Sequence, residues 1–140
     1  MLSLTVKVPV TLSLYNIDCI IIGAFEGGIT YWCSGAEVIQ QPTRDLTYEE
    51  YDEEEYIQRN YSKLKNETKI LICGGSILLY DEEGAHEEDL EKYTLKYEKL
   101  VKGIEIYCSK HGIINDNSDL DAYSYDMIIQ YALFGEVIYG

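Results

Sequence analysis

Residues 90–112 read LEKYTLKYEKLVKGIEIYCSKHG and carry the clearest helical pattern in the chain. Apolar side chains recur there mostly at spacings of three and four residues, which place them on one face of an α-helix. These apolar positions are Leu90, Tyr93, Tyr97, Leu100, Val101, Ile104, Tyr107 and Cys108. Lys110 and His111 suit the negative end of a helix dipole, and Gly112 suits a helix stop. The sequence therefore predicts an amphipathic helix that ends near His111.

A second helix is predicted close to the C-terminus, over residues 120–134. Asp119 or Ser118 would cap its N-terminus, because both side chains can accept a hydrogen bond from a free backbone N–H. Gly135 would end it, since glycine readily adopts the left-handed conformation of a helix stop. The apolar residues beyond this glycine predict a short terminal strand over residues 136–139.

Strand signals dominate the first half of the chain. Apolar and polar residues alternate over residues 3–13, a period that predicts a strand. A short, mostly buried helix is expected over residues 17–25, with Asn16 as its cap. Four other stretches look extended, namely residues 29–32, 36–40, 70–72 and 76–80. This order of elements predicts an α+β fold, in which two or three helices pack on one face of a small antiparallel sheet.

The chain has 140 residues, which is enough for one hydrophobic core and too few for two. We therefore expect a single α+β domain over residues 1–140, with an acidic, tyrosine-rich insert at about 45–62. The four cysteines form no CxxC pair, and no basic segment precedes an apolar run at the N-terminus. These features predict reduced thiols, no signal peptide and a cytoplasmic location.

The balance of charge is unusual. The chain has 25 acidic and 11 basic residues, which give a formal net charge of −14. Lys and Arg must neutralise phosphates before a protein binds nucleic acid strongly, so this balance excludes direct nucleic-acid binding through a basic surface. The same balance disfavours binding to anionic membranes.

Two acidic segments, residues 45–55 and 81–91, hold seven acids each. Such runs often serve only solubility. Tyrosines stand within the first segment, however, and tyrosine supplies rigid amphipathic contact area at protein interfaces. Rows of carboxylates can also present the charge pattern of a DNA backbone. We interpret the segments as a partner-binding surface formed by Tyr48, Glu49, Glu50, Tyr51, Asp52, Glu53, Glu54, Glu55, Tyr56, Glu87, Glu88 and Asp89.

No pattern of residues in the chain predicts catalysis. Cys108 and His111 have the spacing of a nucleophile and a base on one helix, but the negative end of the helix dipole would raise the pKa of a thiol there. Residues 116–121 resemble half of a calcium-binding loop that lacks its glycine and its glutamate. The sequence therefore favours a protein that is not an enzyme and has no metal site and no cofactor.

Two stretches resemble segments of small phage and prophage accessory proteins. AFEGGITYW, residues 24–32, is similar to their A-[LF]-E-G-G-[IS]-x-Y-W segment, and DMIIQYALFGEVIYG, residues 126–140, is similar to their C-terminal ending. The resemblance extends to residues 74–81 and 95–104, whereas the insert at 45–62 departs from the family's pattern. It implies a phage-encoded accessory protein in an infected bacterium, and it implies no catalytic residues.

Together these observations favour a phage-encoded acidic protein that inhibits a bacterial defence or host nucleic-acid enzyme by stoichiometric binding. Anti-CRISPR and anti-restriction proteins act in this way, and mimicry of DNA would direct the protein into a basic nucleic-acid-binding cleft. The alternative is a sponge for a nucleotide immune signal, in which Tyr31 and Trp32 stack on the ligand and Arg44 or Arg59 pairs with it.

A possible pocket consists of Glu26, Tyr31, Trp32 and Glu136. The same region has a purely structural interpretation, in which a tight turn at Gly27 and Gly28 lets the two aromatic side chains pack. Trp32 and the many tyrosines of this small domain also make a homodimer plausible.

Overall fold

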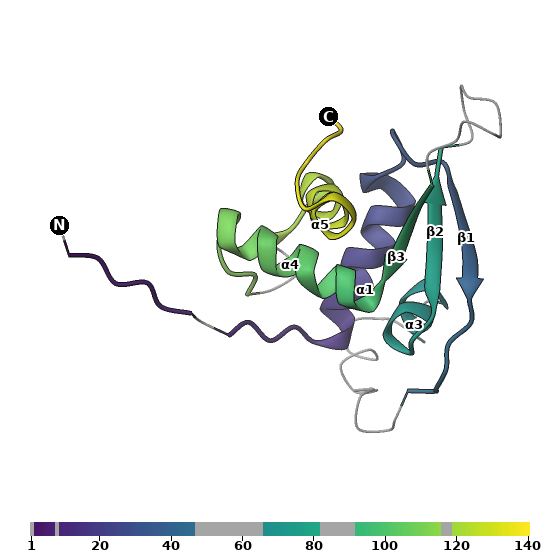
Figure 1. Ribbon diagram of the computed structural model, residues 1–140, viewed down its shortest axis with the longest axis horizontal. Coiled ribbons are helices and arrows are strands. Elements are labelled where there is room, and N and C mark those ends of the chain that lie inside the picture. Colours follow the sequence, from purple (N-terminus) through teal and green to yellow (C-terminus); the bar gives the residue numbers. More distant parts are fainter. Residues whose placement is uncertain (1, 8, 47–65, 82–91, 116–118) are drawn as a thin grey trace.

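A three-stranded antiparallel sheet lies at one side of the protein, in the order β1–β2–β3 (Figure 1). Its strands are β1 (Gly35–Gln40), β2 (Ser76–Tyr80) and β3 (Lys92–Lys96). The computed structural model of the chain describes residues 2–7, 9–46, 66–81, 92–115 and 119–140.

One face of the sheet forms a wall of the core. Ile77 of β2 lies opposite Val38 of β1 and Leu95 of β3, and Leu79 of β2 lies opposite Ala36 of β1. Directly opposite residues in an antiparallel pair share a face, so these five side chains lie on the same side. Ile77, Leu79 and Leu95 are buried, whereas Ala36 and Val38 are exposed. The core face is therefore covered in its middle and open at the β1 edge.

Four α-helices and one π-helical turn occur in the described part of the chain. They are α1 (Leu14–Gly23), η1 (Ala24–Gly28), α3 (Asn66–Ile72), α4 (Tyr97–His111) and α5 (Ala122–Phe134). α1, α4 and α5 lie together on one side of the sheet (Figure 1). The expected α+β class with an antiparallel sheet is confirmed.

The core lies between the sheet and these helices. Its fully buried side chains include Ile20 of α1, Leu100 of α4 and Ile128 of α5. α4 and α5 approach closely because Gly103 of α4 faces the backbone of Ile128 and of Ala132, where a Cβ atom would lie only 2.7 Å from the Ala132 nitrogen. This close contact holds α4 and α5 against each other.

The predicted C-terminal helix forms, with a later start. α5 begins at Ala122, and its cap is Asp121 rather than Asp119 or Ser118. Asp121 is the cap because it forms a capping box with Ser124, in which each side chain accepts a hydrogen bond from the backbone N–H of the other residue. The expected stop at Gly135 is confirmed by its left-handed φ of 75°.

The predicted helix over residues 90–112 begins later than its apolar spacing indicated. α4 starts at Tyr97, and residues 92–96 form β3 instead. Tyr93 fits the helical spacing, but Tyr93 and Leu95 also alternate as in a strand, and pairing with the buried strand β2 favours the strand. The predicted end at His111 is confirmed.

Helix α1, unlike α4 and α5, begins before its predicted start. It starts at Leu14 because the hydroxyl of Ser13 accepts a hydrogen bond from the Asn16 backbone N–H at 3.2 Å. Ser13 is therefore the cap, and Asn16 is not.

Four of the six predicted extended stretches are not strands. Residues 70–72 belong to α3, and residues 29–32 form turns after η1. Residues 3–13 are irregular where they are described, apart from the cap residue, and residues 136–139 follow α5 without joining the sheet. The stretches at 36–40 and 76–80 are confirmed as β1 and β2.

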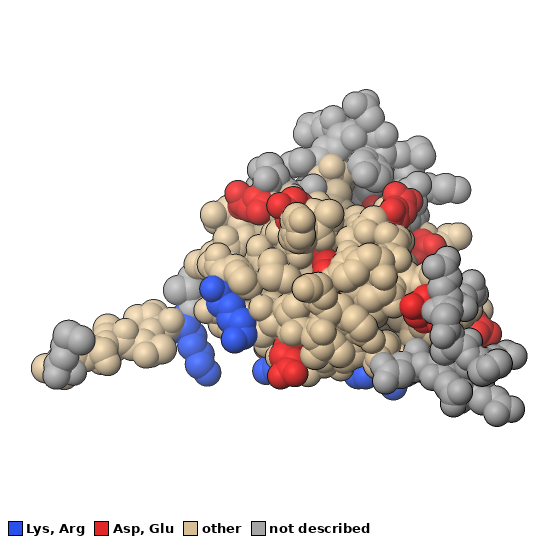
Figure 2. All heavy atoms as spheres, turned by 90° about the horizontal axis from the view of Figure 1, so that it is seen from above, with Lys and Arg blue, Asp and Glu red and all other residues tan. Residues whose placement is uncertain are grey.

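The described surface carries charges of both signs. On the face shown in Figure 2, the described Asp and Glu side chains stand in small, separate groups among uncharged residues. Lys102 and Glu105, which are both exposed on α4, approach within 3.7 Å of each other. No helix of the described residues is long and apolar enough to cross a bilayer.

Candidate functional site

The most polar part of the interior surrounds Asp126, in the second turn of α5. This residue is 7% exposed, and its carboxylate accepts three hydrogen bonds. Oδ1 accepts from Trp32 Nε1 and from Gln130 Nε2, both at 2.8 Å. Oδ2 accepts from the Tyr31 hydroxyl at 2.5 Å. All three donors are uncharged, so directed hydrogen bonds compensate the burial of this carboxylate.

Gln130 lies one helical turn after Asp126 and holds the C-terminal tail, residues 136–140. Its side chain is fully buried. Gln130 Oε1 accepts the backbone N–H groups of Ile138 at 2.8 Å and of Tyr139 at 2.9 Å, and its Nε2 lies 3.3 Å from the Tyr139 carbonyl. A side-chain amide thus supplies the partners that a neighbouring strand would supply. This is the physical reason why the predicted terminal strand is absent.

Four aromatic rings pack beside this network. The rings of Trp32 and Tyr139 are stacked, with centroids 4.8 Å apart and planes inclined by 3°. The Tyr139 hydroxyl lies 2.9 Å from the Tyr93 hydroxyl, and the Tyr93 ring meets Phe134 edge-on at 4.7 Å. Because Trp32 is only 5% exposed, it is a core residue and offers no surface for a homodimer.

Tyr31 differs from its neighbour Trp32 because much of its ring faces solvent. The residue is 56% exposed, but its hydroxyl is held between Asp126 and Gln130. Desolvation of the hydroxyl, followed by the hydrogen bond to Asp126 and the negative charge of that residue, together raise the pKa of Tyr31 to about 12. Tyr31 is therefore a hydrogen-bond donor at neutral pH.

We call Tyr31, Trp32, Asp126, Gln130 and Tyr139 the Asp126 network. Both carboxylate oxygens of Asp126 and both polar atoms of the Gln130 amide are engaged in it. It joins three parts of the chain, namely the turn after η1, helix α5 and the C-terminal tail. Its chemistry is that of a rigid framework, since its hydrogen-bonding groups already bind one another.

The predicted pocket is only partly assembled. Tyr31 and Trp32 do converge, but the carboxylate that they share belongs to Asp126. Glu26 is exposed on η1, and Glu136 is exposed at the start of the tail. The structural interpretation of the turn at Gly27 and Gly28 fits this arrangement best.

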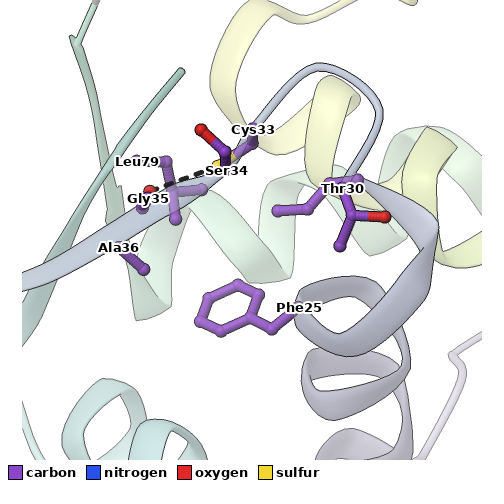
Figure 3. A pocket seen from close by; sticks show the side chains of 8 residues that line it. Phe25, Thr30, Cys33, Ser34, Gly35, Ala36 and Leu79 are labelled. Carbon is purple, nitrogen blue, oxygen red and sulfur yellow. Dashed lines mark hydrogen bonds between the residues drawn. The ribbon is translucent and has the colours of Figure 1, made fainter. Parts of the chain in front are cut away.

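A hollow lies beside this turn, between η1 and the β1 edge of the sheet (Figure 3). Its volume is about 280 Å³. Its walls are Phe25, Ile29, Thr30, Cys33, Ser34, Gly35, Ala36 and Leu79. None of these side chains is charged, so the hollow suits an apolar group and not a phosphate or a nucleotide. Burial raises the pKa of the Cys33 thiol, which keeps it protonated and unreactive.

The residues considered for catalysis have structural partners. His111 Nε2 lies 3.1 Å from the Tyr131 hydroxyl, and the His111 ring packs on Tyr107 at 4.8 Å. Cys108 packs against the core. Of the calcium-like stretch, residues 116–118 lie outside the described residues, and Asp121 is the cap of α5. Among the described residues, no group of three or more His, Cys, Asp or Glu could hold a metal ion.

The predicted partner-binding residues, 48–56 and 87–89, all lie outside the described residues. The chain on either side of them is described. Before the first acidic segment, the Thr43 backbone N–H donates to the Cys73 carbonyl at 2.8 Å, close to the start of β2. At the start of the second, Asp81 follows the end of β2 and accepts a hydrogen bond from Ser34 at 3.0 Å. The two acidic segments therefore leave the sheet at opposite ends of β2.

Comparisons of the chain with protein-family models, with curated proteins and with solved structures found no match.

Sequence reasoning did not single out Asp126 or Gln130 as site residues. Both interrupt an otherwise apolar face of α5, four residues apart, and polar residues at such positions need buried partners. That spacing was the signal for a polar network. Its partners Trp32 and Tyr139 come from distant parts of the chain, so only the folded structure shows them together.

Proposed function

We propose that this protein is a phage-encoded acidic inhibitor that binds the basic nucleic-acid-binding cleft of a bacterial defence or host enzyme. It would act stoichiometrically, in the manner of anti-CRISPR and anti-restriction proteins. The resemblance of residues 24–32 and 126–140 to phage accessory proteins supports the phage origin. The location of the negative charge is the observation that carries the proposal.

The whole net charge resides in the two acidic segments. Residues 45–55 and 81–91 hold seven acids each and no Lys or Arg. The remainder of the chain therefore has 11 acidic and 11 basic residues and is neutral in sum. A coat that served only solubility would spread over the surface, whereas this charge is confined to two stretches.

The two acidic segments join the described fold near opposite ends of β2 and are therefore separated by its length. A strand of five residues spans roughly 17 Å, so the points at which the described chain enters the two segments are separated by about the length of β2. A partner that contacts both segments must be basic over a comparable distance, and a nucleic-acid-binding cleft has this property. Long-range attraction would also accelerate the encounter, most strongly at low salt.

The tyrosines support the proposal in part. Several of those in the described regions serve the fold, since Tyr107 and Tyr131 are buried and Tyr139 is stacked on Trp32. Four further tyrosines, Tyr48, Tyr51, Tyr56 and Tyr61, lie in or near the first acidic segment of the sequence. Combined with carboxylates, they would supply the apolar contact area that charge alone lacks.

The nucleotide sponge finds less support. Trp32 is buried and stacked on Tyr139, so its ring serves the fold instead of a ligand. Arg44 donates to the carbonyls of Asp45 and Ile72 on the surface, and Arg59 lies outside the described residues.

The test begins with plaque assays in hosts that each carry a single defence system, which identify the system that the protein inhibits. Purified protein is then titrated into the DNA-cleavage reaction of that system. We expect complete inhibition near one protein molecule per enzyme and weaker inhibition as salt rises. Inhibition by far fewer molecules than enzyme would contradict stoichiometric binding.

Two variants locate the binding surface. Glu→Gln substitution at five positions neutralises one segment or the other. The first variant changes Glu49, Glu50, Glu53, Glu54 and Glu55, and the second changes Glu82, Glu83, Glu87, Glu88 and Glu91. Each should weaken inhibition by about tenfold or more, because charge pairs at an interface are removed.

A matched control removes the same number of charges elsewhere. It carries Glu→Gln at the exposed residues Glu26, Glu37, Glu98, Glu105 and Glu136. This variant should inhibit within about twofold of the wild type, since exposed charges away from an interface contribute little. Equal loss in all three variants would show that net charge matters and the two segments do not.

A further inference from the structure

The N-terminal arm, residues 2–12, has the alternating pattern of a strand, but its described residues pair with none of the described strands. Leu2, Leu4 and Val6 are 101%, 87% and 66% exposed. Ser3, Thr5 and Lys7 alternate with them, so an extended arm has one apolar face and one polar face. Three large apolar side chains on one face are costly to leave in water, and their burial would be favourable.

The sheet has an edge that could receive such a strand. β1 pairs with β2 on one side only, and among the described strands none lies beyond it. No described strand pairs with the backbone N–H and C=O groups on its outer side, and such a row is a template for another strand. Ala36 and Val38 of β1 lie on the core face and yet are exposed, because the helices do not extend over this edge.

The hollow lies at the same edge (Figure 3). Its floor and walls include Phe25 and Ile29 from the helical side, and Ala36 and Leu79 from the core face of the sheet. Cavities of about 150 Å³ already accept a benzene molecule, so a volume of about 280 Å³ accommodates more than one aliphatic side chain. A strand added to β1 would direct every second side chain toward this hollow.

We propose that the arm of one molecule adds to the β1 edge of a second copy of the chain and fills the hollow with Leu4 and Val6. The arm leaves the molecule on the side opposite β1 (Figure 1), so it extends away from its own edge. Reciprocal exchange of two arms would give a closed dimer with twofold symmetry. This proposal is independent of what the acidic segments bind.

Charge on the other face of the added strand is complementary. With Leu4 and Val6 directed to the core face, Thr5 and Lys7 lie on the outer face. The outer face of β1 carries Glu37, which is exposed. A cross-strand pair of opposite charges favours this pairing, and the polar residues of the arm remain in water.

The oligomeric state in solution tests the proposal. Size-exclusion chromatography with light scattering should give a dimer for the wild type. Leu4→Gln with Val6→Gln should raise the dissociation constant of the dimer at least tenfold. The matched control, Ser3→Gln with Thr5→Gln, changes the same arm on its polar face and should leave the dissociation constant nearly unchanged. These arm residues lie outside the core, so both variants should fold, as circular dichroism will verify.

A complementation experiment tests the receiving edge. Ala36→Arg places a charge at the mouth of the hollow and should also prevent dimer formation. Mixing this variant with the Leu4→Gln/Val6→Gln variant should restore association, because the first supplies an intact arm and the second an intact edge. A monomeric wild type would overturn the proposal. This holds both for an arm that exchanges its amide hydrogens freely and for an arm that is protected from exchange by pairing with its own sheet. A dimer that is insensitive to the arm variant would overturn it as well.

Discussion

The indole ring of Trp32 lies flat against the phenol ring of Tyr139, with the two planes inclined by only 3°. Trp32 belongs to the turn after η1, and Tyr139 belongs to the C-terminal tail. Helix α5 holds both of them, since the Trp32 indole N–H donates to Asp126 and the Tyr139 backbone N–H donates to Gln130. The stack therefore places Tyr139 of the tail over the polar network around Asp126, where it packs against the core.

Removing the tyrosine ring should expose the tryptophan. Because Trp32 is the single tryptophan of the chain, its fluorescence reports this site alone. In Tyr139→Ala we expect the emission to shift to longer wavelength and acrylamide quenching to increase, as water reaches the indole. Tyr123→Ala is the control, since Tyr123 is 79% exposed on the surface of α5. An unchanged spectrum in Tyr139→Ala would contradict the stack.

Loss of the Asp126 carboxylate should be costly to stability. Asp126→Ala leaves the Trp32 indole N–H and the Tyr31 hydroxyl without their acceptor and removes the shortest hydrogen bond of the Gln130 amide N–H. We expect the free energy of unfolding in urea to fall by about 2–4 kcal/mol, because buried donors then lack partners. Asp126→Asn keeps one acceptor oxygen and should lose less. A loss below about 0.5 kcal/mol for the alanine variant, which is typical of a surface position, would show that the network is not stabilising.

Stability should fall at high pH as Tyr31 titrates. Its pKa is raised from 10.0 to about 12 in the folded protein. Between these values the unfolded chain has released the proton and the folded chain retains it, so the free energy of unfolding decreases as pH rises through this interval. Tyr31→Phe should remove that part of the dependence.

Absorbance of tyrosinate provides the direct measurement. The difference between the titration curves of the wild type and Tyr31→Phe should have its midpoint near 12. In the Asp126→Asn background the midpoint should move toward the ordinary value, because the negative charge of Asp126 is one of the causes of the shift. A midpoint near 10 in the wild type would mean that the Tyr31 hydroxyl is not held as described.

The close approach of α4 and α5 should make Gly103 intolerant of a side chain. Alanine normally favours a helix over glycine, but a Cβ atom at this position meets the backbone of Ile128 and Ala132. We expect Gly103→Ala to lower the free energy of unfolding by about 1–3 kcal/mol, as overpacking does. Gly27→Ala is the control, because no atom lies within 4 Å of its Cβ position. Equal stability of the two variants would contradict the helix packing.

Local patterns in the sequence predicted the elements whose signals are not contested by another part of the chain. The glycine after residue 134 ends α5, Gly112 caps the end of α4, and the β-prone stretches at 36–40 and 76–80 form β1 and β2. Residues 92–96 form β3 although Tyr93 fits the helical spacing, because Tyr93 and Leu95 also alternate as in a strand. They pair with β2, which is a separate stretch of the sequence but a neighbour in the sheet, and this pairing decided the outcome.

The sequence by itself determined the fold class, the two main helices and the confinement of the whole negative charge to residues 45–55 and 81–91. These follow from composition and short-range periodicity, which need no knowledge of distant contacts. Only the tertiary structure decided that Asp126 gathers Tyr31 and Trp32, and that Gln130 replaces a strand as the partner of the tail. It also left the described part of the N-terminal arm outside the sheet, and the outer edge of β1 without a partner among the described strands. A strand needs a partner as well as a pattern, and the partner is a property of the fold.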